Sequence, residues 1–335
     1  MKHVTIFDIA KKMGISPSTV SRALNDHPYI SQQTKLKVKK IAEELDFSPN
    51  SIAKSLKNNS TTTIGVIVPD IKHDFFSSAI SGIEEAAYNA GYSIIVCQSN
   101  DSLEREIINT NVLLHQRIAG VIVSISLHTG HGDHFKKFMN RGIPLVFFDR
   151  SCDDVVASKV IIDDSKSAFN AVDYLIKKGR KRIAHLGGPQ ILSIYRKRLE
   201  GYMQALKNAG LTYKEEFVLF GDVHEKDGYK ALDILFKKGL IPDAVFTIND
   251  DVAIGALQRI KEEGLKIPED IAIIGFSNTK ISSVVNPSIT TVNQPSFEMG
   301  KKASDILIEL IEINNRMIEP KTIVLKTELI VREST

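Results

Sequence analysis

The first 25 residues carry side chains whose types and spacing suit contacts with DNA. A proline, two hydroxyls, a guanidinium and an amide occur together, as Pro17, Ser18, Ser21, Arg22 and Asn25. An arginine can donate two hydrogen bonds to a guanine edge, and serine or asparagine can serve other base edges or phosphates. On a helix these five residues face away from an inward apolar side formed by Val20, Ala23 and Leu24. The segment is therefore typical of a DNA recognition helix.

Two short helices joined by a tight turn would present this set of side chains. Thr5 and Asp8 have the spacing of a capping box for the first helix. Its apolar stripe consists of Ile6, Ile9, Ala10 and Met13. Gly14 supplies the turn, Ser16 is a good N-cap for the second helix, and Pro17 suits the first position of that helix. A third helix over about residues 31–45 would close a three-helix core, with packing residues Leu36, Val38, Ile41, Ala42 and Leu45.

An ordered string of residues extends this pattern along the N-terminal region. It comprises Thr5, Asp8-Ile9-Ala10, Gly14-Ile15-Ser16, Thr19-Val20-Ser21-Arg22, Leu24-Asn25, Ser31, Thr34 and Pro49-Asn50. With this string the chain resembles the headpiece of the LacI family of bacterial transcription regulators, and the resemblance continues through the rest of the sequence. A generic helical hairpin with a surface arginine is the alternative, and it explains the turn but not the whole string. The DNA-binding residues that we expect are Thr5, Ser16, Pro17, Ser18, Thr19, Ser21, Arg22, Asn25, Ser31, Thr34, Asn50, Ala53 and Leu56.

A short segment links this region to the rest of the chain. Residues 51–56 could form one to two helical turns, which are marginal alone in water. A polar linker follows. The resemblance implies that two copies of this hinge pair in the minor groove, where Leu56 acts as a wedge that kinks the DNA. The alternative is that Leu56 is simply the last apolar residue of a short helix.

Charge is distributed unevenly along the chain. Residues 1–60 contain ten Lys/Arg and five Asp/Glu, whereas the whole chain has a formal net charge of +3. Residues 61–335 therefore carry a net charge of −2. The positive excess lies where a polyanion would bind, although a solvated basic helix would show the same excess.

Length and composition are those of a multidomain globular protein. The 335 residues, 43% of them hydrophobic, are enough for two or three domains. No apolar run approaches the length of a membrane span, and the N-terminus lacks the apolar core of a signal peptide. Cys97 and Cys152 form neither a disulfide framework nor a CxxC metal site. We therefore expect a protein of the reducing cytoplasm, with no membrane association.

From residue 63 onward, short apolar runs alternate with amphipathic helical segments. This alternation predicts βαβ units and parallel sheets covered on both faces. Strands are expected at 64–68, 93–97, 120–124, 145–148, 160–162, 183–186, 218–220, 244–248 and 271–275. Helices are expected at 75–90, 102–117, 132–141, 165–178, 193–209, 227–238 and 250–263. The repeated order indicates two doubly wound parallel-sheet subdomains that face each other across a cleft.

The predicted organisation follows from these patterns and from the resemblance. It is a helix-turn-helix headpiece over 1–47, a hinge helix and linker over 48–62, and an effector-binding and dimerisation domain over 63–335. The resemblance implies a periplasmic-binding-protein-like core with a third crossing near 290–293. Helix 296–314 would then return to the first subdomain and strand 322–326 to the second. Subdomain 1 is thus expected at about 63–159 plus 293–320, and subdomain 2 at about 160–290 plus 321–335.

Polar and aromatic side chains at the ends of the expected strands predict a ligand pocket in the cleft. In open α/β sheets ligands bind at the carboxyl ends of the strands, and carboxylates, amides and a guanidinium suit hydroxyl groups. The resemblance implies a matching set for sugars. The candidate effector-binding residues are Asp70, Phe75, Phe76, Ser124, Asp149, Asp163, Arg198, Asn249, Ser277 and Gln294. Each could instead be a helix N-cap or a surface charge, and Asp163, Asp164 and Asp250 sit where N-caps belong.

Two departures from the family pattern fall in the expected pocket. Many sugar-binding members carry an aspartate where this chain has Ser277, and a serine cannot clamp a vicinal diol as a carboxylate does. The common Asn-Pro-Phe-Phe is here His73-Asp74-Phe75-Phe76. Both departures therefore weaken the case for a plain hexose as the effector.

The sequence offers few residues arranged for metal binding or for enzyme catalysis. His128, His131 and His134, with Asp133, could hold a divalent metal on a helix, but Gly130 and Gly132 favour a loop, and we expect no metal. No nucleophile elbow, P-loop, dinucleotide fingerprint or zinc-protease motif is present, so we expect neither an enzyme nor a cofactor.

These observations together predict a cytoplasmic, homodimeric transcription regulator, which we expect to be a repressor. Two headpieces would bind a pseudo-palindromic operator in double-stranded DNA. A small-molecule effector, a sugar or sugar derivative, would bind between the subdomains and control operator affinity. A sugar receptor without DNA activity is the rival interpretation, and a sugar-processing enzyme is a more distant one. The headpiece and the missing signal peptide argue against the receptor, and the lack of an apparent nucleophile or acid–base pair argues against the enzyme.

Overall fold

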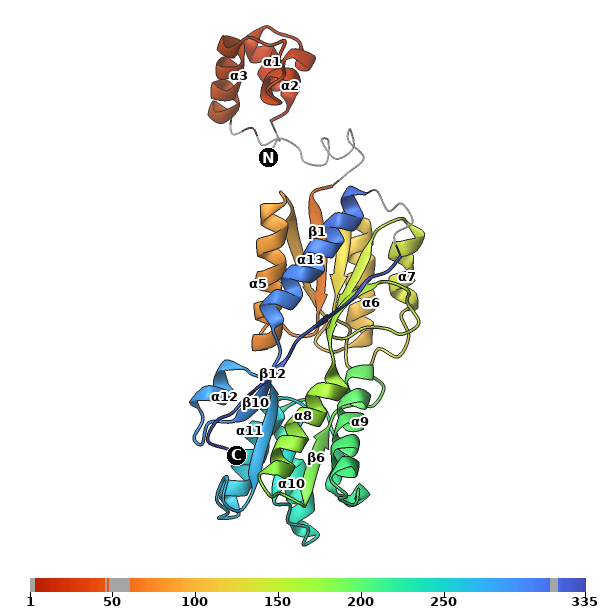
Figure 1. Ribbon diagram of the computed structural model, residues 1–335. Coiled ribbons are helices and arrows are strands. Elements are labelled where there is room, and N and C mark those ends of the chain that lie inside the picture. Colours follow the sequence, from red (N-terminus) through yellow and green to blue (C-terminus); the bar gives the residue numbers. More distant parts are fainter. Residues whose placement is uncertain (1–3, 46, 48–60, 314–318) are drawn as a thin grey trace. The chain divides into compact units, whose positions relative to one another are not determined.

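The computed structural model describes residues 4–45, 47, 61–313 and 319–335. The chain divides into two compact units, one ending at Thr61 and one beginning at Thr62 (Figure 1). The hinge helix expected over 51–56, with the candidate DNA contacts Asn50, Ala53 and Leu56, lies outside the described residues. No helix in the described part of the chain is long and apolar enough to cross a membrane.

The N-terminal unit contains three helices, α1 (Ile6–Met13), α2 (Pro17–Leu24) and α3 (Gln32–Glu44). The first helix is capped by Asp8, whose carboxylate accepts from the backbone N–H of Thr5 at 2.8 Å. Gly14 ends this helix with φ +66°, a left-handed conformation that glycine adopts without steric cost. Ser16 caps α2 by accepting from the N–H of Thr19 at 3.1 Å, and Pro17 takes the first helical position. The predicted helix-turn-helix is therefore confirmed.

A small core joins the three helices of this unit. Its fully or nearly fully buried residues are Ile9, Ala10, Val20, Ala23, Val38 and Ala42. Leu36, which we expected in this core, is 67% exposed, so that prediction was wrong. The inward face of α3 follows Lys35, Val38 and Ala42 at helical spacing, and Leu36 lies one position off it. Lys35 is buried instead, and its ammonium pairs with the carboxylate of Asp26 at 2.8 Å.

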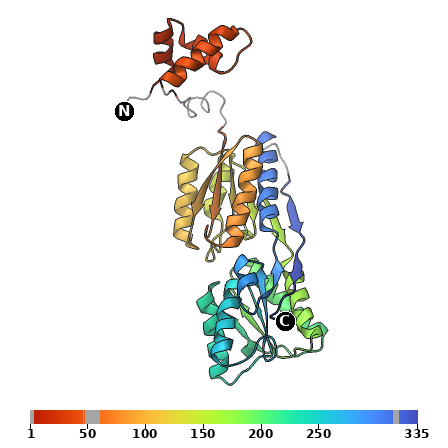
Figure 2. The ribbon, with the colours of Figure 1, turned by 90° about the vertical axis from the view of Figure 1, so that its left-hand side faces the viewer.

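The larger unit contains two six-stranded sheets (Figures 1 and 2). The first is wholly parallel and has the order β11 (Thr322–Leu325), β5 (Ser158–Ile162), β4 (Leu145–Phe148), β3 (Gly120–Val123), β1 (Thr63–Val68), β2 (Ser93–Gln98). The second has the order β12 (Glu328–Ile330), β10 (Thr290–Asn293), β9 (Ala272–Ser277), β8 (Ala244–Thr247), β6 (Ile183–Gly187), β7 (Val218–Phe220). Only β12 is antiparallel to its neighbour. The predicted pair of doubly wound subdomains is thus confirmed.

Two strands belong to a different sheet from the one we expected. Residues 160–162 and 322–326 were assigned to the second subdomain, but β5 pairs with β4 of the first sheet, and β11 pairs with β5. The reason is that β4 continues into its parallel neighbour β5 through a loop without a helix. An alternation of strands and helices gives no information about such a connection. The chain therefore first crosses to the second subdomain after β5.

Helices cover both sheets and pack in close pairs (Figure 2). In the first subdomain α5 (Asp74–Asn89) packs on α13 (Ser296–Glu312), while α6 (Leu103–His115) and α7 (Asp133–Asn140) cover the other face. In the second, α8 (Asp164–Lys177) pairs with α9 (Ser193–Asn208), and α10 (Glu225–Lys237) pairs with α11 (Asp250–Glu262). The short helices are η1 (Glu215–Phe217) and α12 (Lys280–Val284). At Gly82 an added Cβ would lie 2.1 Å from the carbonyl oxygen of Phe297, so glycine is required there.

Candidate ligand pocket and nucleic-acid interface

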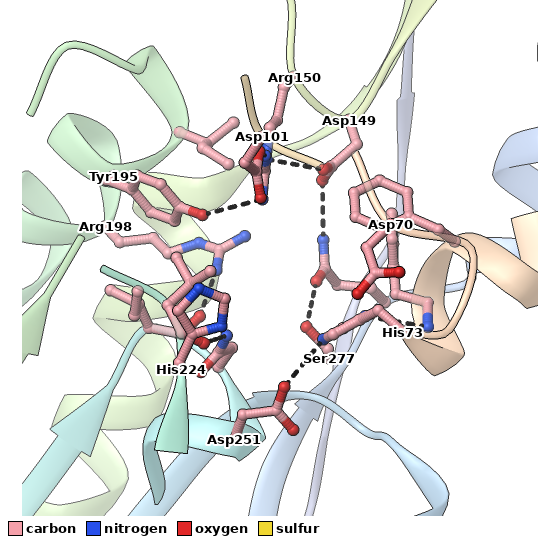
Figure 3. Close-up of a pocket in the computed structure, with 17 residues that line it drawn as sticks. Asp70, His73, Asp101, Asp149, Arg150, Tyr195, Arg198, His224, Asp251 and Ser277 are labelled. Carbon is pink, nitrogen blue, oxygen red and sulfur yellow. Dashed lines mark hydrogen bonds and ion pairs between the residues drawn. The ribbon is translucent and has the colours of Figure 1, made fainter. Parts of the chain in front are cut away.

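A pocket lies between the two subdomains of the larger unit, at the carboxyl ends of the strands (Figure 3). The space between its walls is about 630 Å³, including open solvent at the mouth. The lining residues are Asp70, His73, Phe75, Phe76, Asp101, Asp149, Arg150, Ile194, Tyr195, Arg198, Val223, His224, Ile248, Asn249, Asp251, Ser277 and Gln294. They come from both subdomains and span more than 220 positions of the sequence.

The structure brings eight of the ten predicted pocket residues together. Those eight are Asp70, Phe75, Phe76, Asp149, Arg198, Asn249, Ser277 and Gln294. Ser124 does not line the pocket but is fully buried, and its hydroxyl has no hydrogen-bond partner in the described part of the chain. Asp163 is exposed and caps α8 by accepting from the N–H of Lys166 at 3.0 Å. The N-cap alternative therefore holds for Asp163.

Sequence reasoning missed several polar residues of the pocket. The candidate list left out Asp101, Arg150, Tyr195, His224 and Asp251, and His73 entered only as a departure from the family pattern. Helix starts were the available signal, because His73 and His224 are the N-caps of α5 and α10, and Asp251 lies in the first turn of α11. Tyr195 lies one turn before Arg198 on α9, so both side chains reach the same side of that helix.

Arg198 is buried and held from three directions. Its Nε donates to the Asp164 carboxylate at 2.8 Å, and one terminal nitrogen donates to the carbonyl of Ile248. The guanidinium also lies 3.7 Å above the centre of the Phe276 ring, a cation–π arrangement. These contacts hold the guanidinium rigidly at the pocket, with the charge balanced by a carboxylate.

Arg150 connects the two subdomains. Its Nη1 donates to Asp101 at 2.7 Å, and its Nη2 donates to the hydroxyl of Tyr195 in the second subdomain at 3.4 Å. The Nε atom is buried without a hydrogen-bond partner in the described part of the chain, and lies 3.9 Å from an Asp149 oxygen. A buried donor without an acceptor costs stability, so this nitrogen is suited to a ligand oxygen or a water.

A hydrogen-bonded chain of side chains lies opposite the arginines. Ser277 donates to the side-chain oxygen of Gln294 at 2.8 Å, and the amide nitrogen of Gln294 donates to Asp149 at 3.4 Å. Burial raises the pKa of the Asp149 carboxyl, while Arg150 and Arg198 oppose that rise. Asp149 and Ser277 also adopt positive φ, at +57° and +104°. Strained backbone of this kind is common at functional sites.

Asn249 caps a helix as well as lining the pocket. Its side-chain oxygen accepts from the N–H of Val252 at 2.9 Å, which caps α11. Its side-chain nitrogen donates to the carbonyl of Val223 at 2.7 Å. Only the second lone pair of the oxygen and the second amide hydrogen remain for another partner.

Aromatic rings form an apolar wall beside these polar groups. Phe75 and Phe76 meet edge to face with their centroids 5.1 Å apart. Tyr195 faces the pocket from the second subdomain, below Arg150 in the close-up (Figure 3). An apolar wall with a few directed polar groups is typical of small-molecule sites.

The candidate DNA-binding face belongs to the other unit and is described by itself. Ser16, Ser18, Arg22 and Asn25 are exposed on or beside α2, and Pro17, Thr19 and Ser21 are partly exposed. The Asn25 amide donates to the Ser21 carbonyl at 2.8 Å, so part of its hydrogen-bonding capacity is used locally. Thr5, Ser31 and Thr34 are at or near the starts of α1 and α3, where helix N-termini favour phosphate groups.

The three-histidine cluster does not assemble. His134 is buried and its Nε2 lies 2.9 Å from the Glu106 carboxylate, which also accepts from Ser126 and Thr129. Among the described residues no group of three or more His, Cys, Asp or Glu side chains is arranged to hold a metal ion.

Two family models match the chain. Residues 5–50 match "Bacterial regulatory proteins, lacI family". Residues 61–331 match "Periplasmic binding proteins and sugar binding domain of LacI family". The boundary between these matches coincides with the boundary between the two structural units.

Curated relatives and solved structures match along nearly the whole length. The HTH-type transcriptional repressor PurR of Actinobacillus pleuropneumoniae serotype 3 is 31% identical, with 98% of each chain covered. Catabolite control protein A of Priestia megaterium is 32% identical, with 99% of each chain covered. A lac repressor dimer bound to operator and the anti-inducer ONPF superposes with a TM-score of 0.87 at 27% identity, covering 99% of each chain. A complex of the transcriptional regulator CelR with cellobiose gives 0.75 at 29% identity, covering 99% of this chain and 100% of that one.

Proposed function

The chain belongs to the LacI family of bacterial transcription regulators, and on this basis we propose that it is a repressor controlled by a small-molecule effector. It is a DNA-binding transcription regulator and not an enzyme. The observation that carries the proposal is the combination of a helix-turn-helix unit with a two-subdomain pocket in one chain. A sugar receptor without DNA activity would account for the pocket alone.

The headpiece would read base edges through α2. Arg22 is exposed near the end of this helix, and we propose that it contacts a guanine in each half-site. Thr5, Ser16, Pro17, Ser18, Thr19, Ser21, Asn25, Ser31 and Thr34 would supply the other base and phosphate contacts. In the hinge, Asn50, Ala53 and Leu56 keep the minor-groove role that the family resemblance implies.

Charge in the pocket favours an uncharged effector. Four aspartates line it against two arginines, and each arginine already faces a carboxylate, Arg150 that of Asp101 and Arg198 that of Asp164. A phosphate would add negative charge beside buried Asp149, whereas ligand hydroxyls could donate to the carboxylates. We therefore propose a polyhydroxy compound, a sugar or sugar derivative without a phosphate. The cellobiose held by the structurally similar CelR agrees with this class.

A second copy of the chain is the partner that we propose for one face of the first subdomain. The edge strand β2 has Ile95 and Val96 exposed, and the helices that contact it expose Tyr88 on α5 and Ile108 and Val112 on α6. Exposed apolar side chains on adjoining elements mark protein interfaces. A dimer would also place two headpieces on two half-sites of a pseudo-palindrome. The similar lac repressor is a dimer on its operator.

Two measurements on the full chain test the proposal. A gel-shift assay with a selected pseudo-palindromic operator should show a specific complex whose affinity falls steeply with salt, because phosphate contacts release counterions. A thermal-shift screen should then compare each sugar with its phosphate and with nucleobases, since ligand binding raises apparent stability. We expect an uncharged sugar to raise the melting temperature and to change operator affinity. Absence of any operator complex would favour the receptor interpretation, and tighter binding of a sugar phosphate would contradict the effector class.

A further inference from the structure

Two consecutive side chains at the start of α5 reach across the cleft to the second subdomain. The Nε2 atom of His73 lies 3.5 Å from an oxygen of Asp251 in the first turn of α11 (Figure 3). The carboxylate of Asp74 accepts from the backbone N–H of Lys280, the first residue of α12, at 2.9 Å. One short segment of the first subdomain therefore contacts two separate helix starts of the second.

We infer that His73 and Asp74 form a clasp that holds the two subdomains closed and so controls entry to the pocket. This inference rests on the proposed role of the cleft as the effector site. The subdomains are also joined by three chain crossings, which follow β5, β10 and β11, and by the contacts of Arg150 with Tyr195 and of Arg196 with Asp153. Non-covalent contacts across the cleft set the fraction of molecules that is closed. This is because a hinge by itself gives open and closed arrangements of similar energy.

The imidazole of His73 is placed to use both of its nitrogens. Nδ1 accepts from the N–H of Phe75 at 3.3 Å and so caps α5, which leaves Nε2 as the atom that carries a proton towards Asp251. The ring thus joins the start of one helix to the start of another. An asparagine at this position would keep the cap, since its side-chain oxygen accepts in the same way, but it is too short to reach Asp251.

The Asp74 contact is the stronger half of the clasp. It joins an ionised carboxylate to a backbone N–H, and charge-assisted hydrogen bonds are shorter and stronger than neutral ones. The donor is a backbone group, so the side chain of Lys280 contributes nothing to the contact. Thr279, the residue before it, has an extended backbone with ψ 155°, which is compatible with a proline at position 280.

This geometry provides a matched pair of variants at one position. Lys280→Pro removes the N–H donor, and proline is well tolerated at the first position of a helix. Lys280→Ala keeps the N–H and removes only the side chain. Asp74→Ala removes the acceptor, and His73→Asn and Asp251→Asn test the other half of the clasp.

The readout is the distance between the subdomains in the full chain, without DNA or effector. Spin labels at Ser81→Cys on α5 and Gln258→Cys on α11, both exposed positions, report this distance by pulsed electron resonance. The free cysteines Cys97 and Cys152 are replaced by alanine, and labelled chain is diluted with unlabelled chain so that one pair of labels is measured.

We expect Asp74→Ala and Lys280→Pro each to raise the open-to-closed ratio by about five- to tenfold, the effect of losing one charge-assisted hydrogen bond. Their combination should have no further effect. His73→Asn and Asp251→Asn should raise the ratio by about two- to fivefold, as for a partly exposed pair. Lys280→Ala should match the parent. An unchanged distance distribution in Asp74→Ala and Lys280→Pro, or an equal shift in Lys280→Ala, would overturn the clasp. Since neither DNA nor effector is present, this result is independent of whether the proposed function holds.

Discussion

The headpiece and the ligand pocket are built on different principles. In the headpiece, the candidate DNA contacts among the described residues fall between positions 5 and 34, on three adjoining helices and their caps. In the pocket, Asp70 and Gln294 line the same cavity although they are 224 positions apart in the sequence. Local hydrogen bonds and a small apolar core shape the first, whereas buried pairs between distant residues shape the second. A substitution in the headpiece should therefore act locally, and one behind the pocket should also affect folding.

The largest effect should follow from removing the guanidinium of Arg198. Arg198→Ala leaves the buried Asp164 carboxylate without its partner, which costs about 3–5 kcal/mol in the unfolding free energy of the larger unit. The effector response should also be lost. Denaturant unfolding followed by circular dichroism measures the first effect, since the chain has no tryptophan.

A double variant separates the two roles of Arg198. Arg198→Met combined with Asp164→Asn removes both charges, so most of the stability should return. The effector response should stay absent if Arg198 contacts the ligand. A loss below about 1 kcal/mol in Arg198→Ala would mean that the pair with Asp164 is not buried in solution.

The next largest effect is a pH dependence of the larger unit. Burial raises the pKa of Asp250 to about 6 although Thr291 and Thr279 donate hydrogen bonds to its carboxylate. The folded state then binds more protons than the unfolded state between about pH 4 and pH 6. The contribution of Asp250 to stability is therefore fully present below about pH 4 and is lost as the pH rises through 6.

The variant Asp250→Asn isolates this contribution. Relative to it, the parent chain should lose about 2–3 kcal/mol between pH 4 and pH 6, the equivalent of a shift of roughly two pKa units. Unfolding curves of both chains at matched pH values give the difference. Parallel pH profiles would show that Asp250 titrates normally in the folded chain.

In the headpiece, the largest expected effect concerns base selection. Arg22→Ala should cost about 1–3 kcal/mol of discrimination at one base pair of each half-site, with the effector response unchanged. Gel-shift titrations on operators substituted at each position, and on random DNA, provide the measurement. An equal loss on operator and random DNA would assign Arg22 to phosphate contact instead.

The smallest effect should come from the cap of α2. Ser16→Ala removes the acceptor for the Thr19 N–H and should destabilise the headpiece by about 1 kcal/mol. Ser16→Asp keeps an acceptor and is the control. Amide exchange at Val20 and Ala23 in the full chain should accelerate about fivefold in the first variant, while amides of the larger unit stay unchanged. Faster exchange in both units would contradict the separation that we infer.

Local rules predicted the headpiece well. Thr5, Asp8, Gly14, Ser16 and Pro17 each act on the backbone within a few residues, so their spacing is enough to place the first two helices. The failure at Leu36 has a local cause as well. The long apolar stem of Lys35 can be buried on α3 because its ammonium pairs with the carboxylate of Asp26.

The pocket could be predicted only in part. Strand ends bring their side chains to one edge of a sheet, which is why Asp70, Asp149 and Asn249 were found from their positions after apolar runs. Gln294 came instead from the crossing that the family resemblance implies. The same rule also selected Asp163, because an N-cap and a ligand contact have the same position and residue type in sequence. Helix starts such as His224 can be located from the sequence, but whether they face the cleft depends on how the subdomains meet.

The sequence by itself determined the helix-turn-helix, the two α/β subdomains and most of the strand-end residues, because each depends on periodicity and capping over a few turns of chain. Only the tertiary structure decided which sheet β5 and β11 join, that Arg150 reaches Tyr195, and that His73 and Asp74 meet the starts of α11 and α12. The side-chain contacts among these join residues that are 45 or more positions apart. Their partners are selected by packing and by the pairing of buried polar groups, neither of which leaves a pattern in the local sequence.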